Sequence, residues 1–206
     1  MEQHGSAAIK ENIKMTIRTK QTPFGYKAPP YKKNFVIFES GTPGTYTITV
    51  KKALFEITIT GGGGGGSNGA GGSGATLRVQ TILDAGTYNL TIGSGGNGAG
   101  AYVRNNNGSP GSASTISGTS LSITANGGAG RNGRRNGGGG GTVGTLSYTF
   151  RNQNTISLKS TNGADYGLSY LTGNYDGYGA GGQPQSSDTG AGYPGKSGYI
   201  KIQFIK

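Results

Sequence analysis

The chain has 206 residues, of which 44 are glycine and only 31% are apolar, with no Trp and no Cys. So few apolar side chains cannot fill a close-packed core over the whole length, which argues against a doubly wound or barrel enzyme; the missing Cys excludes disulfides and thiolate chemistry. Nineteen Lys and Arg against eight Asp and Glu give a net charge of +11, which is weak evidence for a polyanionic partner because spaced cations also cover ordinary solvated faces.

The first 40 residues are predicted to form a basic, extended arm that attaches to something else. Three prolines lie in residues 21–33 and favour an extended chain, whereas residues 9–17 fit either a strand or a helix. No basic cluster followed by an apolar stretch opens the chain, so we expect no secretory signal peptide. No apolar run reaches the roughly 20 residues that a membrane helix needs.

From residue 34 onward, short segments of alternating apolar and polar residues predict β-strands. In residues 54–60, for example, Phe55, Ile57 and Ile59 fall on one face. The predicted strands are residues 34–39, 45–50, 54–60, 76–83, 87–92, 121–125, 145–150, 155–159 and 199–205. We therefore expect a mainly β domain over residues 41–206, with little or no α-helix.

One heptapeptide pattern occurs twice. Residues 44–50, Gly-Thr-Tyr-Thr-Ile-Thr-Val, return as residues 86–92, Gly-Thr-Tyr-Asn-Leu-Thr-Ile. Turn residues precede both copies, and both lead toward glycine tracts, so the repeated unit is predicted to be strand, glycine run, strand.

The glycine runs at residues 61–66 and 137–141 admit two interpretations. They are either flexible linkers or ordered segments. Because glycine tracts alternate with strands as far as residues 199–205, whereas a linker would separate two domains, order is favoured. Ordered polyglycine forms a threefold helix like polyproline II, and such helices can pack side by side through backbone hydrogen bonds. The predicted fold is therefore short antiparallel strands that clamp a bundle of packed polyglycine II helices.

Catalytic and nucleotide-binding motifs are weak. Residues 190–197 match the P-loop expression, but a strand pattern follows them where a P-loop needs a helix. The lone His4 lies outside the glycine-rich part, and the few acids there have no metal-binding or paired-carboxylate spacing. We expect no enzyme activity, no cofactor, no metal site and no specific nucleic acid.

Three polar segments between strands are candidate recognition loops. Asn-rich and Arg-rich turns suit exposed tips, and Arg can grip phosphate or carboxylate. Tyrosines among Gly, Asn and Asp either cover glycine backbone or stand as rigid anchors for a partner. The candidate binding residues are Arg104, Asn105, Asn106, Asn107, Arg131, Asn132, Arg134, Arg135, Tyr166, Tyr170, Tyr175, Asp176 and Tyr178.

The glycine-rich part resembles the glycine-rich domain of bacteriophage and prophage tail-fibre proteins. The likeness rests on the Gly-Thr-Tyr strands and on the Ile-Thr-Ile-Thr stretch entering residues 61–66, on Ile-Thr-Ala-Asn-Gly-Gly at residues 123–128, and on the closing Gly-Lys-Ser-Gly-Tyr-Ile at residues 195–200. More loosely, the chain is similar to tip adhesins of T-even-like phages, in which loops on a polyglycine II sandwich recognise the host surface. Residues 1–40 match no known attachment module, and the glycine tracts are less regular than those of the T-even tips.

The resemblance implies a non-enzymatic virion protein, made in the cytoplasm and released by lysis, whose loops bind a bacterial surface receptor, a glycan or an outer-membrane protein. Residues 1–40 would then attach to other virion subunits. The alternative is a structural subunit that polymerises into an extracellular filament or coat through this arm. Ice binding by a flat slab of polyglycine II helices would require a regular array of Thr or small residues on one face, and the sequence shows none.

Overall fold

The computed structural model describes residues 34–67, 69–100, 107–131, 144–151, 155–161, 177–183 and 191–205. Within these ranges the chain forms β-strands and no helix, which confirms the predicted mainly β class. The strands are β1 (Val36–Ser40), β2 (Gly44–Val50), β3 (Ala53–Thr60), β4 (Thr76–Leu83), β5 (Gly86–Ile92), β6 (Ser114–Gly118), β7 (Leu121–Ala125), β8 (Leu146–Phe150), β9 (Thr155–Thr161) and β10 (Tyr199–Phe204).

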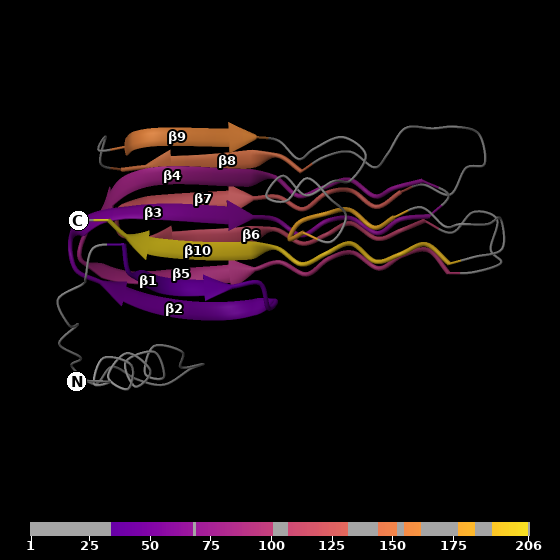
Figure 1. The fold of residues 1–206 in the computed structure, drawn as a ribbon, viewed down its shortest axis with the longest axis horizontal. Coiled ribbons are helices and arrows are strands. Elements are labelled where there is room, and N and C mark those ends of the chain that lie inside the picture. Colours follow the sequence, from indigo (N-terminus) through magenta and orange to yellow (C-terminus); the bar gives the residue numbers. More distant parts are fainter. Residues whose placement is uncertain are drawn as a thin grey trace, which may run out of the picture.

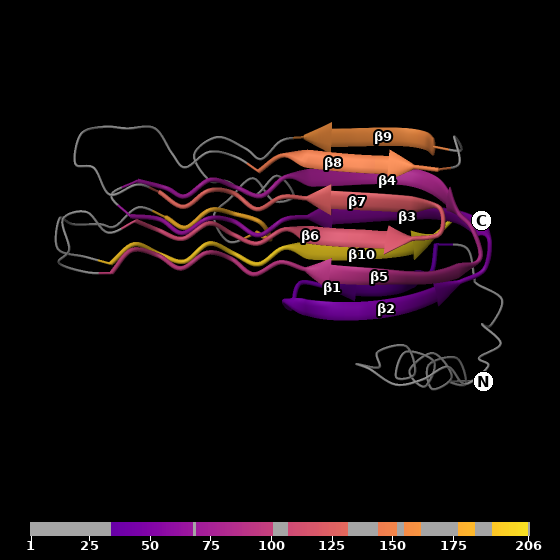
Figure 2. The same cartoon turned by 180° about the vertical axis from the view of Figure 1, so that it is seen from behind.

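Two five-stranded antiparallel sheets form a sandwich, as the two opposite views in Figures 1 and 2 show. Sheet A has the order β1-β10-β3-β4-β9, and sheet B has the order β2-β5-β6-β7-β8. Nine strands agree with the prediction to within two residues at each end. The prediction missed β6, because Ile116 is its only large apolar residue and the alternation is therefore not visible. Strand β1 lies within the residues assigned to the arm, yet it pairs with β10 inside sheet A.

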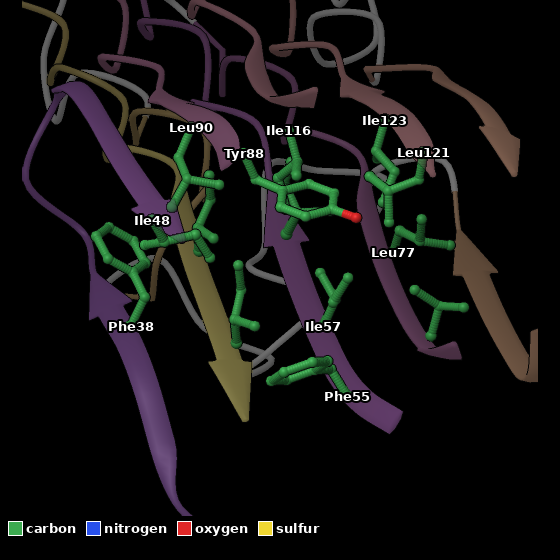
Figure 3. Packing of buried hydrophobic residues seen from close by; sticks show 14 of the residues in the cluster. Phe38, Ile48, Phe55, Ile57, Leu77, Tyr88, Leu90, Ile116, Leu121 and Ile123 are labelled. Atoms are coloured by element: carbon green, nitrogen blue, oxygen red, sulfur yellow. The ribbon is translucent and has the colours of Figure 1, made fainter. Parts of the chain in front are cut away.

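The inner faces of the two sheets bury one apolar core (Figure 3). Sheet A contributes Phe55, Ile57 and Leu77, which are fully buried. Sheet B contributes Tyr88 and Ile123 from the opposite side. The alternation seen in the sequence therefore places apolar side chains between the sheets, where their removal from water stabilises the sandwich.

The two copies of the repeated heptapeptide are neighbours in sheet B. Strands β2 and β5 pair along their whole length, from Gly44 opposite Ile92 to Val50 opposite Gly86. Both glycines have φ +153°, a conformation that favours glycine. In each copy the tyrosine hydroxyl donates to the carbonyl four residues earlier. The two copies of the repeat thus begin their strands with the same glycine conformation and the same tyrosine hydrogen bond.

Seven glycine-rich segments continue from the same end of the sandwich as parallel wavy traces, which we call the bundle (Figure 1). The central segment, residues 61–66, follows β3. Three outward segments also run away from the sandwich, and three return segments run back toward it. The outward segments are residues 93–99, 126–131 and 179–183, and the return segments are residues 70–75, 108–113 and 191–198.

The central segment is hydrogen-bonded to all six others. Its six backbone amides donate to the three return segments in turn, with a repeat of three residues and N···O distances of 2.8 to 3.0 Å. Gly61 and Gly64, for example, donate to the carbonyls of Ala75 and Gly72 in one return segment. Carbonyls of Gly62 to Gly66 accept amides from the three outward segments. A three-residue repeat is the one expected of packed polyglycine II helices.

The six surrounding segments form a closed ring, in which outward and return segments alternate. Each return segment donates amides to the outward segments on its two sides. One such bond for each of the six contacts is, in order around the ring, Gly72 to Ala129, Gly108 to Arg131, Ser109 to Asn97, Gly195 to Gly96, Tyr193 to Gln183 and Gly71 to Gly182. Backbone pairing therefore holds this half of the domain together, where side chains are few.

The number of neighbours explains where glycine is needed. A Cβ atom added at any residue of the central segment would come closer than 3.0 Å to a neighbouring backbone atom, because neighbours surround that segment on every side. In the return segments, glycine is required at every third residue, where Cβ would point at the central segment, as at Gly192 and Gly195. Residues 190–197, which match the P-loop expression, overlap the last return segment. Strand β10 follows them, as the sequence pattern predicted.

The outer face of sheet A carries a charged cluster. Glu56 accepts hydrogen bonds from Arg78 at 2.7 and 3.1 Å and from Gln80 at 3.0 Å. Burial raises the pKa of Glu56, but the hydrogen bonds from Gln80 and Arg78 and the charges of Arg78 and Lys201 outweigh it and hold the pKa below 4.5.

This lowered pKa predicts a pH dependence of stability. The Glu56 carboxylate stabilises the folded state above its unfolded pKa, and this contribution is lost as pH falls through the lower, folded pKa. Replacing Glu56 with Gln is therefore expected to narrow the difference in Tm between pH 6 and pH 3, measured by thermal melts. An unchanged difference would show that other groups cause the acid sensitivity.

Candidate functional site

Most chain connections of the bundle begin and end at its far end, opposite the sandwich. The central segment turns back there, and Gly66 meets Ala99 and Tyr193 through backbone hydrogen bonds of 2.9 Å. The chain leaves the described bundle near this level at residue 100, at residue 131 and at residue 183, and it re-enters at residues 107 and 191. Two predicted recognition loops, at residues 104–108 and 131–136, are thus attached at this end.

Asn107 and Arg131 are the two predicted site residues that the structure places at the far end. Asn107 is exposed, and the next residue, Gly108, donates its amide to the carbonyl of Arg131. Arg131 differs from the expected exposed tip, because it is only 9% exposed and its guanidinium lies against Gly69. Its own amide donates to Gly65, so Arg131 is the last residue of an outward segment.

Tyr178 does not lie at the far end. Its neighbour Gly179 packs against Thr60, at the junction between the sandwich and the bundle. The Tyr178 ring covers Gly41 and stacks on Tyr199 with centroids 4.7 Å apart and an interplanar angle of 18°. Of the two roles predicted for the tyrosines, Tyr178 therefore takes the covering of glycine backbone, although 42% of it remains exposed.

Tyr199 is part of a small polar cluster at this junction. Its hydroxyl donates to a Glu39 carboxylate oxygen at 2.5 Å, and the Lys201 ammonium lies 3.9 Å from the other oxygen of Glu39. Burial raises the pKa of Tyr199 beyond its usual range, and the hydrogen bond and charge of Glu39 raise it further. Tyr199 is therefore a neutral donor to Glu39.

Tyr193 was not among the candidate binding residues, although it is the most exposed large aromatic residue in the described part. It is 53% exposed, and its carbonyl accepts the amide of Gly66 at the far end of the bundle. The sequence signal was its place before Pro194 in a Gly-Tyr-Pro-Gly stretch, where every third residue is glycine. Because Gly192 and Gly195 face the central segment, Tyr193 between them directs its side chain away from that segment.

The remaining candidate residues lie outside the described ranges. They are Arg104, Asn105, Asn106, Asn132, Arg134, Arg135, Tyr166, Tyr170, Tyr175 and Asp176. Residues 162–176, which hold the last four, join the end of β9 to Gly177, so this connection starts and finishes near the junction. The third predicted loop is thus anchored apart from the other two.

The structure shows a regular array of Thr and other small polar residues that the sequence alone does not reveal. The outer face of sheet B carries two rows of uncharged polar side chains that cross all five strands. The rows are Thr45, Thr91, Thr115, Thr124 and Ser147, and Thr47, Asn89, Ser117, Ser122 and Thr149. Only strand pairing brings these residues into rows, and they lie on a β-sheet, whereas the ice-binding interpretation placed the array on the glycine helices.

In the parts of the chain that the structure describes, no three metal-ligating side chains come together. Across the same ranges, nothing helical has the length and apolar character that a membrane crossing requires.

Comparison with known proteins identifies the domain. No curated protein gives a significant match. The family model described as a glycine-rich domain matches residues 39–203, from the end of β1 to within β10, which is most of the chain and includes sheet B, most of sheet A and the bundle segments. The chain therefore belongs to the glycine-rich domain family.

Proposed function

We propose that the protein is a non-enzymatic virion component, a tail-fibre or tip protein, that binds a bacterial surface receptor through loops held by a polyglycine II bundle. The supporting observation is the bundle itself: one central segment hydrogen-bonded to six others, with connections at one end. The three-residue hydrogen-bond repeat supports assigning the seven segments to the polyglycine II conformation.

Such a bundle suits recognition by loops. Its backbone pairs inside a ring of fixed segments, so the loop anchors at residues 100, 107 and 131 are held in place relative to one another. Binding residues are commonly found on loops positioned by a rigid scaffold, because an ordered anchor lowers the conformational entropy lost on binding. The residues that precede β1 would attach the domain to a larger assembly.

The receptor hypothesis predicts that binding depends on the far end. Replacing Arg134 and Arg135 with Ala, in the connection that leaves at Arg131, is expected to lower binding to bacterial cells at least tenfold. The removed guanidinium groups would otherwise contact phosphate or carboxylate on the cell surface. Binding of the fluorescently labelled protein to a panel of bacteria, measured by flow cytometry, checks this.

The matched control removes the same charge from the opposite end. Lys51 and Lys52 lie in the turn between β2 and β3, and the exposed ion pair of Lys52 with Asp84 contributes little to stability. The variant with both lysines replaced by Ala is expected to bind like the wild type. An equal loss in both variants would show non-specific charge attraction, and full binding by the arginine variant would remove this loop from the proposal.

The alternative function, a self-assembling filament or coat, predicts a different appearance. Negative-stain images of the purified protein would show long polymers for the filament and separate particles for the adhesin.

A further inference from the structure

The three return segments share a three-residue pattern of backbone donors. In each, one residue in three donates its amide to one neighbouring outward segment, and the next residue donates to the other. In residues 108–113 and 191–198, no described residue accepts a backbone hydrogen bond from the third residue. The third positions are Ala70 and Ser73 in the first return segment, Pro110 and Ala113 in the second, and Ala191, Pro194 and Ser197 in the last.

Proline occurs at third positions only in the two return segments whose outer side is exposed. Pro110 and Pro194 are both exposed. In the remaining return segment, the outer side is covered by the chain itself: Gly144 donates its amide to Ser73 at 2.8 Å, and Ser73 is fully buried. There the third positions are not proline. The chain thus has one return segment whose outer side is covered and two whose outer sides are open, and only the open ones carry proline.

The open side is one continuous surface, which we call the proline flank: residues 93–99, 108–113 and 191–198. These segments are adjacent in the ring, with residues 93–99 between the other two. Lys196 is the one charged residue among them, so charge on the flank itself does little to keep a second copy away.

We propose that Pro110 and Pro194 close the proline flank to a glycine segment from a second copy of this chain. On the covered side, residues 144 and 145 extend the bundle by backbone pairing in both directions: Gly144 donates its amide to the carbonyl of Ser73, and Asn126 donates its amide to the carbonyl of Thr145. Proline has no N–H, so a segment added at the flank would lose one buried hydrogen bond at each proline. Exposed edge strands in β-sheets are protected from pairing in the same way.

Restoring the two amides tests the proposal. The double variant Pro110→Ala and Pro194→Ser uses the residues that already stand one repeat later, at Ala113 and Ser197. Sedimentation velocity over a range of concentrations, at low and high salt, is expected to show the variant at least doubling its mean mass where the wild type stays constant. High salt screens the net charge of +11, which would otherwise oppose association.

Pro43→Ser is the matched control, because Pro43 is exposed in the turn between β1 and β2 and belongs to none of the ring segments. It is expected to behave as the wild type does. The proposal is wrong if the double variant keeps the wild-type mass at both salt concentrations, if Pro43→Ser associates equally, or if the wild type itself associates with the same concentration dependence.

A second pair of variants tests the donor pattern itself and does not depend on the folding of the double variant. Ala113→Pro removes an amide without a backbone acceptor, whereas Ser112→Pro removes the amide that donates to Ser94 at 2.9 Å. We expect Ala113→Pro to melt close to the wild type and Ser112→Pro to melt at clearly lower temperature. An equal loss of Tm in both would contradict the assignment of third positions.

Discussion

Gly63→Val is expected to unfold the domain. A Cβ atom at Gly63 would lie closer than 3.0 Å to the backbone oxygen of Ala180, and the central segment has no open side toward which it could move. Separating the segments would break several buried backbone hydrogen bonds at once. We expect a loss of more than about 4 kcal/mol, a size that single substitutions reach only when they disrupt a buried arrangement. Thermal or urea unfolding monitored by circular dichroism measures it.

Ser109→Val is the control for this prediction. It adds a similar side chain to the bundle, but at an exposed residue of a return segment. Its effect is expected to stay within about 0.5 kcal/mol, as for most surface substitutions. If Gly63→Val melts like the wild type, residues 61–66 are a tether and the bundle does not form.

Tyr88→Ala is expected to be the most damaging single truncation in the sandwich. Tyr88 is fully buried, its ring packs on Gly118, and its hydroxyl hydrogen-bonds with the Asp84 carbonyl at 3.0 Å and the Ser120 hydroxyl at 2.6 Å. Truncating a buried aromatic residue costs about 3 to 5 kcal/mol through lost burial and the cavity left behind. Chemical denaturation gives the change in unfolding free energy.

The repeat supplies the matched variant. Tyr46 is the equivalent residue in the other copy and donates the same hydrogen bond, to Thr42 at 2.9 Å, but it lies on the edge strand β2 and is only partly buried against Phe38. Tyr46→Ala is therefore expected to lose about half as much stability as Tyr88→Ala. Equal losses would show that the shared hydrogen bond, and not burial, dominates.

Sequence patterns predicted the sandwich well, because burial between two sheets imposes strict alternation. Residues 76–83 and 121–125 were predicted with the observed bounds of β4 and β7. Strand β6 carries one large apolar residue and is recognisable only from its partners on both sides. The Thr rows of sheet B likewise arise from strand pairing, most of it between strands that are distant in sequence.

The candidate site was less predictable, because a loop's position depends on where the segments before and after it enter the bundle. The sequence does not show that Arg131 is the last residue of an outward segment, or that Tyr178 lies at the junction. Conversely, the six-glycine run could be assigned to an ordered interior, but not to the centre of a ring. Its central place follows from the hydrogen bonds of six other segments.

The place of residues 191–204 has a consequence for synthesis. This stretch supplies both a ring segment and β10, which lies between β1 and β3 in sheet A. A chain growing on the ribosome therefore leaves the facing edges of β1 and β3 unpaired until these residues have been translated, because β10 fills the gap between them in sheet A. The long-range pairing of β10 with β1 and β3 can form only after this point, which favours slow completion of sheet A.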